Sequence, residues 1–130
     1  MTLTDPIADS LVSIKNSDRA SKHEVVLRPA TSLLGEILKV IQKQGYIGTF
    51  ELVEDGREGI YKISLNGHIN DCKAIKPRYA VKKNGFEKFE KRYLPAKDIG
   101  VLVVTTPAGV ITHREAKEKG LGGRLLAYIY

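Results

Sequence analysis

The feature of this sequence that most restricts its fold is the unbroken apolar run Ile-Gly-Val-Leu-Val-Val at residues 99–104. A short run of this kind, rich in β-branched residues, predicts a central, buried strand. Thr105 and Thr106 follow the run directly. Their hydroxyls are therefore expected to project from the end of a rigid element, where they can contact a ligand.

Helix and strand signals alternate along the rest of the chain. Helices are predicted over residues 4–16 and 31–45, as one or two turns within 85–95, and over 112–120. Strands are predicted over residues 24–28, 46–54, 59–67, about 68–75, 99–106, 109–111 and 123–130. The fold class is therefore α+β, with helix–strand–helix–strand–strand in the first half and a mostly β second half that holds a short helix.

Particular residues mark where two of these helices begin. Thr4 is a suitable N-cap, Asp5 favours the positive end of a helix dipole, and Pro6 needs no amide donor at that position. Thr112 and Glu115 have the T-x-x-E spacing of a capping box. Both patterns predict well-defined helix N-termini.

Charge is distributed unevenly between the two halves. Residues 1–65 carry 8 Lys and Arg against 9 Asp and Glu, whereas residues 66–130 carry 13 against 6, a net charge of +7. This step predicts a boundary between an N-terminal α/β subdomain at residues 1–66 and a C-terminal subdomain at residues 67–130. A chain with a pI near 9.4 suits a polyanion such as RNA, DNA or an acidic membrane surface, although solubility alone also accounts for the charge.

Most of the positive charge lies in residues 73–97, which we call the basic segment. It contains Lys73, Lys76, Arg78, Lys82, Lys83, Lys88, Lys91, Arg92 and Lys97, with Tyr79, Phe86, Phe89 and Tyr93 between them. Cations beside aromatic rings can bind phosphates and support stacking on unpaired bases. A solvated loop whose rings enter the core accounts for the same residues.

Three glycines near the C-terminus complete the candidate site. Gly120, Gly122 and Gly123 carry no side chain, so the backbone can approach a partner closely and its amides can face an anion. Taken singly, Gly120 also fits a helix stop, and the other two also fit relief of crowding at the start of a strand. Their position beside the positively charged half favours nucleic-acid binding.

The sequence contains no pattern that indicates catalysis, a metal or a cofactor. Cys72 is the only cysteine, and His23, His68 and His113 have no metal-binding spacing. Neither a phosphate-binding G-x-x-x-x-G-K-[ST] loop nor a G-x-S-x-G nucleophile elbow is present. With no signal-peptide pattern at the start and no apolar segment of about 20 residues, a cytoplasmic protein that does not enter a membrane is expected.

The chain resembles the small-subunit ribosomal protein S8 family over essentially its whole length. The strongest likeness lies in TTPAGVITHREAKEKGLGGRLLAYIY at the C-terminal end, followed by DPIADSLVSIKN at the start. The segments LRPATSLLGEILKVIQKQGYIGTFELVEDGREG and CKAIKPRYAVKK are more similar to the archaeal and eukaryotic branch than to the bacterial one. The resemblance implies two α/β subdomains packed together, with the RNA surface mainly in the second.

The resemblance also implies a function and a set of contact residues. Members of the family are primary binders of small-subunit ribosomal RNA: they dock on a helical hairpin of the central domain, help to organise the platform and contact neighbouring ribosomal proteins. The family's contact motifs correspond here to Thr105, Thr106, Pro107, Gly122, Gly123, Thr4, Asp5 and Pro6. Pro107 replaces the serine usual in the family and so lacks both a hydroxyl and an amide donor.

Lysines and an arginine of the basic segment are expected to add long-range attraction and phosphate contacts. These cations are Lys76, Arg78, Lys82 and Lys83. The main alternative is an extra-ribosomal RNA-binding translational regulator, which sedimentation of the cellular protein would separate from a small-subunit component. No small-molecule substrate is expected. A membrane-surface role is disfavoured because the basic segment lacks a long amphipathic helix.

Overall fold

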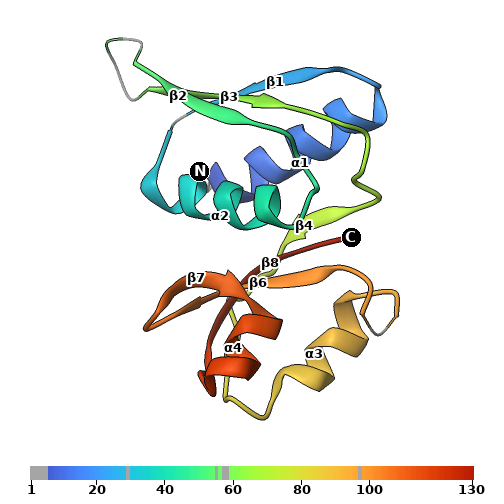
Figure 1. Cartoon of the computed structure of the whole chain (residues 1–130), viewed down its shortest axis with the longest axis vertical. Helices are drawn as coiled ribbons and strands as arrows, with labels where there is room; N and C mark the ends of the chain where they lie inside the picture. Colours follow the sequence, from blue (N-terminus) through green and yellow to red (C-terminus); the bar gives the residue numbers. More distant parts are fainter. Residues whose placement is uncertain (1–5, 29, 55, 57–58, 97) are drawn as a thin grey trace, which may run out of the picture. The chain divides into compact units, whose positions relative to one another are not determined.

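The chain forms two compact units, divided between Asn70 and Asp71. The computed structural model of the protein describes residues 6–28, 30–54, 56, 59–96 and 98–130 (Figure 1). Each unit has its own antiparallel sheet and its own pair of helices. The mixed α+β class predicted from the sequence is therefore confirmed.

The first unit is a three-stranded sheet with two helices. Its elements are α1 (Pro6–Arg19), β1 (Glu24–Leu27), α2 (Ser32–Lys43), β2 (Phe50–Val53) and β3 (Ile60–Ser64), with strand order β1-β3-β2. Both helices lie on one face of this sheet (Figure 1). Burial of one stripe from each helix supplies the core, because amphipathic helices gain stability by covering a sheet. That core includes Ile7, Leu11, Ile14, Leu34, Ile37, Leu38, Ile41 and Ile63.

The predicted helix–strand–helix–strand–strand order of this unit is confirmed. Thr31 caps α2, because its hydroxyl accepts from the Leu34 amide at 3.2 Å. After the helix Gly45 takes φ +85°, and the amides of Gly45 and Tyr46 bond back to the last turn. β2 and β3 pair from Phe50↔Ile63 to Val53↔Ile60, as the predicted hairpin requires. Asp55 of its expected Asp-Gly turn lies outside the described residues.

Two predicted boundaries near the end of this unit are wrong. α1 continues to Arg19 instead of ending at Asn16, and the strand expected from His68 begins only at Cys72. Both errors have one cause. The buried carboxylate of Asp18 accepts hydrogen bonds from the amides of Gly67, at 3.0 Å, and Ile69, at 3.2 Å. These amides therefore bond to a helix side chain and not to a neighbouring strand.

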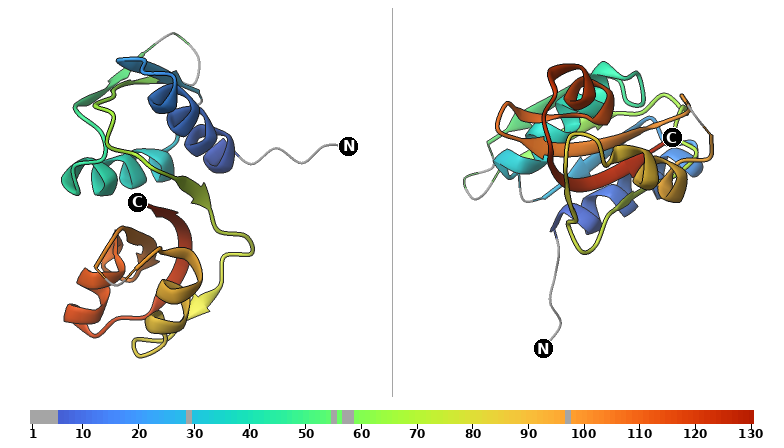
Figure 2. Two further views of the ribbon diagram at one scale, coloured as in Figure 1. Left: turned by 90° about the vertical axis from the view of Figure 1, so that its right-hand side faces the viewer. Right: turned by 90° about the horizontal axis from the view of Figure 1, so that it is seen from below.

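The second unit is a five-stranded sheet with two helices on one face. Its elements are β4 (Cys72–Ala74), β5 (Ala80–Val81), α3 (Phe86–Tyr93), β6 (Val101–Thr106), β7 (Gly109–Thr112), α4 (His113–Lys119) and β8 (Gly123–Ile129). The strand order is β4-β8-β6-β7, and β5 pairs separately with β8. The view from below in Figure 2 shows α3 and α4 in front of these strands.

The apolar run forms the central strand that the sequence predicts. β6 lies between β7 and β8, and Val101, Leu102, Val103 and Val104 are all buried. The predicted short helix also forms, with the Thr112 hydroxyl accepting from the Glu115 amide at 3.2 Å and Gly120 in the left-handed conformation. The strand β5 was not predicted, because two residues are too few to show alternation.

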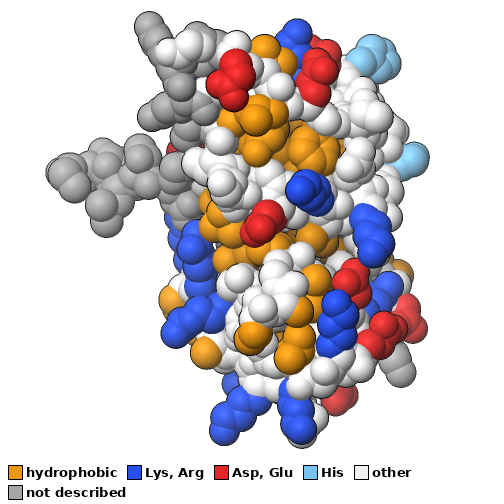
Figure 3. Space-filling model, turned by 60° about the vertical axis from the view of Figure 1, so that its left-hand side comes forward, with side chains coloured by type: hydrophobic (Ala, Val, Ile, Leu, Met, Phe, Trp, Pro, Cys, Tyr) orange, Lys and Arg blue, Asp and Glu red, His pale blue; other side chains and the backbone are white. Residues whose placement is uncertain are grey.

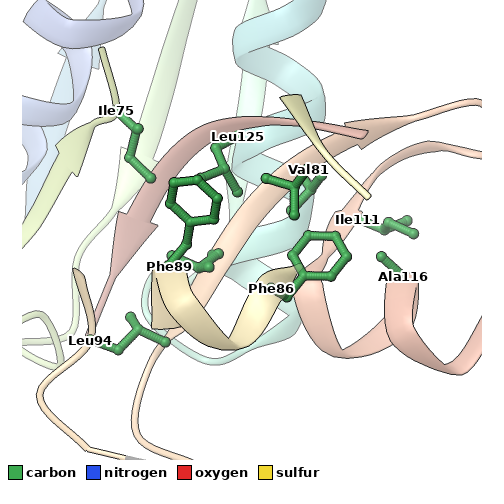
Figure 4. Close-up of a cluster of buried hydrophobic side chains, with 10 residues drawn as sticks. Ile75, Val81, Phe86, Phe89, Leu94, Ile111, Ala116 and Leu125 are labelled. Carbon is green, nitrogen blue, oxygen red and sulfur yellow. The ribbon is translucent and has the colours of Figure 1, made fainter. Parts of the chain in front are cut away.

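The helix α3 is anchored to this sheet through its two phenylalanines. Phe86 and Phe89 point from α3 toward Val81 and Leu125 (Figure 4). Ala116 of α4 joins the same cluster. The basic segment is therefore largely structured: it includes β5 and α3, whose positions are fixed by buried apolar contacts.

Candidate nucleic-acid interface

The two adjacent threonines at the end of β6 differ in what their hydroxyls contact. The Thr106 hydroxyl donates to the Gly109 carbonyl at 2.9 Å and accepts from the Ala108 amide at 3.1 Å. It therefore closes the β6–β7 turn, in which Pro107 and Ala108 are exposed. Its proton is already donated, so it can offer an outside partner only an acceptor.

The Thr105 hydroxyl is available to a partner. Thr105 lies opposite Val110 of β7 and Arg124 of β8, and its side chain is half-buried. Within the part of the chain that the structure describes, its hydroxyl makes no hydrogen bond. A hydroxyl in this state can both donate to a phosphate or ribose oxygen and accept from a base or a 2′-hydroxyl.

The glycine pair at the start of β8 packs against two other segments. A Cβ placed on Gly123 would collide with the carbonyl oxygen of Thr105, and one placed on Gly122 would lie 2.5 Å from the carbonyl oxygen of Val81. The Gly122 position also faces Lys83, whose amide nitrogen would be 3.2 Å from that Cβ. These glycines therefore bring the end of β6 and the segment after β5 to adjacent positions.

Exposed cations surround this corner. Lys82 and Lys83 follow β5 directly, and Lys76 and Arg78 lie on the exposed connection between β4 and β5. Lys and Arg side chains are visible around the lower part of Figure 3, which shows the second unit. We call Thr105, Thr106, Pro107, Gly122, Gly123, Lys82 and Lys83 the corner site.

Sequence reasoning missed one cation at this corner. Arg124 is exposed, lies in register with Thr105 on one side and Ala80 on the other, and donates from Nη1 to the Arg78 carbonyl at 3.4 Å. The available signal was its place in the last strand: it is the only charged residue in the otherwise apolar Gly-Arg-Leu-Leu-Ala-Tyr-Ile-Tyr.

The aromatic rings of the basic segment are buried or half-buried and pack mainly against the core. Phe86 and Phe89 are buried, as the structural interpretation of these rings predicted. Tyr79 and Tyr93 are half-buried, and the Arg92 guanidinium lies over both rings, 5.5 Å and 5.3 Å from their centroids. These contacts occupy ring surface that base stacking would need.

A polar network beneath the helices holds α3 and α4 to β6. His113 is 1% exposed, and its Nδ1 accepts from the Leu102 amide at 3.0 Å. Its Nε2 lies 3.0 Å from Glu90, whose other carboxylate oxygen lies 2.7 Å from Lys117 Nζ. An acceptor at Nδ1 leaves the proton on Nε2, so the imidazole is neutral and donates to Glu90.

The pKa values of this network fit that assignment. Burial lowers the pKa of His113 below its ordinary value of 6.5, and the attraction of Glu90 only partly opposes it. Burial favours the neutral acid at Glu90, but the hydrogen bond from Lys117 and the charges of His113 and Lys117 outweigh it and lower its pKa below 4.5. Glu90 is therefore charged and His113 neutral near pH 7, which is a structural arrangement and not an acid–base pair.

A second perturbed group lies at the β4–β8 edge. Burial, together with donation of its hydroxyl to Asp71 at 3.1 Å, raises the pKa of Tyr128 to about 12. The ring of Tyr128 stacks between those of Tyr93 and Tyr130, with centroids 5.6 Å and 6.0 Å away. This tyrosine therefore remains neutral and links β8 to Asp71, which directly precedes the edge strand β4.

The N-terminal part of the predicted site is not tested by the described residues. Thr4 and Asp5 lie outside the described residues, and Pro6 is the first residue of α1 in the other unit. Their predicted contact role stays a prediction.

Metal and membrane features were also searched in the ranges given above. Over those ranges, no group of three or more His, Cys, Asp and Glu side chains is placed to hold a metal ion. Cys72 is buried. Across the same described residues, no helix has the length and apolarity required to cross a bilayer.

Comparison with known families gives a match over nearly the whole chain. The family model described as ribosomal protein S8 matches residues 5–130, which includes every element of both units. The corner site and the hairpin that carries Thr105 and Thr106 both fall within the matched range.

Proposed function

This chain belongs to the ribosomal protein S8 family, and from that membership we propose that it is a primary RNA-binding protein of the small ribosomal subunit. It binds the central domain of 16S-type ribosomal RNA and helps to organise the platform. The family is a structural one, not an enzyme family, and its members act in translation as RNA-binding parts of a ribonucleoprotein. We further propose a cytoplasmic ribosome as its location and a helical hairpin of the RNA as its docking element.

One observation carries the proposal: residues far apart in the sequence meet at the corner site. Gly122 packs against the segment that carries Lys82 and Lys83, and Gly123 packs against Thr105. A hydroxyl that can both donate and accept thus lies beside exposed cations on a rigid sheet. That combination suits RNA, where positive charge binds phosphates and hydroxyls contact ribose and base edges.

The residues of the corner site and the nearby cations Lys76 and Arg78 make different kinds of contact with the RNA. Thr105 contacts a 2′-hydroxyl or base edge in the shallow minor groove or a distorted internal loop, where RNA is recognised by shape. Lys76, Arg78, Lys82 and Lys83 bind phosphates, a contribution that depends on salt and tolerates changes in RNA sequence. Thr106 and Pro107 hold the turn that presents Thr105, because the Thr106 hydroxyl is bonded within that turn.

Crosslinking of the full chain to small-subunit ribosomal RNA tests this function. We expect crosslinks from the exposed tip residue Ala108 and from Lys83 to nucleotides of one central-domain hairpin. A surface residue of the other unit, Lys39, is the matched control, since it is also exposed. Crosslinks that exclude the central domain, or a corner site that yields none while the RNA is bound, would contradict the proposal.

A further inference from the structure

An open groove of about 840 Å³ lies between β5 and α3, next to the corner site. Its walls are formed by Tyr79, Ala80, Val81, Lys82, Asn84, Gly85, Glu87, Lys88, Phe89 and Lys91. Val81 and Lys82 belong both to this groove and to the segment against which Gly122 packs. The groove is therefore continuous with the corner site.

The groove is positively charged. Lys82, Lys88 and Lys91 line it and are exposed, and Glu87 is the single acidic residue among its lining residues. Glu87 lies 3.4 Å from Lys91 in an ion pair whose two side chains are both 77% exposed. A pair so exposed contributes little to stability and exchanges readily for a contact with an outside anion. Asn84 adds an exposed side-chain amide.

The cations of α3 are held on a rigid support. Lys88 and Lys91 are three residues apart and therefore lie on neighbouring positions of the helix surface. The opposite side of the helix is anchored by Phe86 and Phe89, which point into the core (Figure 4). A preorganised cation loses less conformational freedom when it binds an anion than one on a mobile loop.

The aromatic residues in the groove are not free to stack on bases. Tyr79 has the Phe89 ring at 5.4 Å and the Arg92 guanidinium at 5.5 Å, and Lys88 Nζ lies 5.1 Å from the centroid of Phe89. Phe89 itself is buried. The groove thus offers cations and an amide, but little exposed ring face for a base.

We propose that this groove binds a sugar–phosphate segment of the RNA, as a second contact surface that adjoins the corner site and shares Lys82 with it. The inference rests on the proposed function and extends it. The groove contacts phosphates without stacking on bases, so it tolerates changes in RNA sequence and is sensitive to salt. The corner site and the groove together hold two RNA segments.

Neutralising the Glu87 carboxylate gives the sharpest test. With a transcript of the central domain as probe, Glu87→Gln should tighten binding by about threefold, because it removes the one negative charge that faces the phosphates. Glu118→Gln is the matched control: Glu118 is also exposed, makes the same change in net charge and does not line the groove. If Glu87→Gln binds no more tightly than Glu118→Gln, the groove does not hold phosphate.

Removal of the two α3 lysines should have the opposite effect on RNA affinity. Lys88→Gln with Lys91→Gln should weaken binding by about three- to tenfold and reduce the salt slope by roughly two, one unit for each phosphate contact. Lys39→Gln with Lys43→Gln on α2 is the control pair of equal charge change. Equal slopes for the two double variants would overturn the proposal.

Directed cleavage separates this inference from the proposed function. A hydroxyl-radical source attached at Asn84→Cys should cut an RNA segment different from the one cut from Ala108→Cys; the native Cys72 is fully buried and so is not labelled. Cleavage from the Ala108 position alone would contradict RNA binding in the groove but would leave the proposed function intact. A wild-type chain that does not bind the transcript would overturn both.

Discussion

The two adjacent threonines at the end of β6, Thr105 and Thr106, have different roles. The Thr106 hydroxyl makes two hydrogen bonds within its own turn, whereas the Thr105 hydroxyl makes none with the described residues. A substitution at Thr106 should therefore change mainly the stability of the protein, whereas one at Thr105 should change mainly its affinity for RNA. Testing the two together would confuse loss of the turn with loss of an RNA contact.

Replacing Thr105 by valine should weaken RNA binding without loss of stability. Valine keeps the β-branched shape that suits a strand but removes the hydroxyl. A lost hydrogen bond of about 1 kcal/mol corresponds to roughly a fivefold rise in Kd at fixed salt. Titration of a central-domain RNA fragment measures the affinity, and thermal unfolding confirms that Tm is unchanged. Affinity within about twofold of wild type would show that Thr105 is not a contact residue.

Replacing Thr106 by valine should instead destabilise the protein. Both hydrogen bonds of the turn are lost, and we expect about 1 kcal/mol less free energy of unfolding, since the site is partly exposed. Denaturant unfolding measures the effect, and Thr106→Ser, which keeps the hydroxyl, is the control. Equal stability of the valine and serine variants would mean that the turn does not depend on the hydroxyl.

Alanine substitutions at Gly123 and Gly120 test two different requirements for glycine: close packing at Gly123 and a left-handed backbone at Gly120. Gly123→Ala should lower the free energy of unfolding by about 1–3 kcal/mol, because the new methyl group meets the Thr105 carbonyl and the Val104 side chain. Gly120→Ala meets no atom within 4 Å but must adopt φ +67°, which we expect to cost about 1 kcal/mol. A Gly123 variant as stable as wild type would exclude close packing as the role of that glycine.

At the scale of elements, α3 and α4 are joined to β6 by a buried polar network as well as by apolar packing. His113 on α4 accepts from β6 and donates to Glu90 on α3, while Lys117 on α4 binds the same carboxylate. This network stabilises the fold only while Glu90 is ionised, His113 is neutral and Lys117 is charged. It therefore makes the attachment of both helices dependent on pH.

Stability should fall in two steps as pH decreases. The folded pKa of His113 is below 6.5, so below that pH the unfolded chain binds a proton that the folded chain does not, and stability declines. The folded pKa of Glu90 is below 4.5, so its contribution is present above 4.5 and is lost as pH falls through the lower folded value. Urea unfolding at a series of pH values measures both steps.

The control for this titration is His113→Gln, in which the side chain at position 113 no longer titrates. It should lower stability at pH 7 but remove the first step and leave the second. A wild-type profile that is flat between pH 7 and pH 5 would show that the imidazole is not held neutral by its surroundings.

At the scale of the whole molecule, charge separates the two units. Residues 1–70 carry 8 Lys and Arg against 9 Asp and Glu, and residues 71–130 carry 13 against 6. The net positive charge of the chain thus comes entirely from the unit that contains the corner site. Such a field attracts RNA toward that unit and raises the rate of association, particularly at low salt.

Loss of two corner lysines should be visible in the salt dependence of binding. Lys82→Gln with Lys83→Gln is expected to lower affinity and to reduce the slope of log K against log salt by roughly two units. The control is again Lys39→Gln with Lys43→Gln in the other unit. A slope equal to that of the control would place Lys82 and Lys83 away from phosphate, for example on a neighbouring protein.

Local patterns in the sequence determined most of the helices and strands. The apolar run before Thr105 predicted the central strand, and the Thr112 and Gly120 signals predicted the limits of α4. These features depend on neighbouring residues, through periodicity, capping and turn preferences, and so they are visible in a single chain.

Only the tertiary structure decided which of these residues meet and which groups are already engaged. The strand β5, the extension of α1 to Arg19 and the late start of β4 all depend on partners distant in sequence, such as β8 and the Asp18 carboxylate. The place of Arg124 beside Thr105, and the engaged hydroxyl of Thr106, arise in the same way. Pairing across a sheet and the use of a hydrogen-bonding group depend on three-dimensional neighbours, which no local pattern specifies.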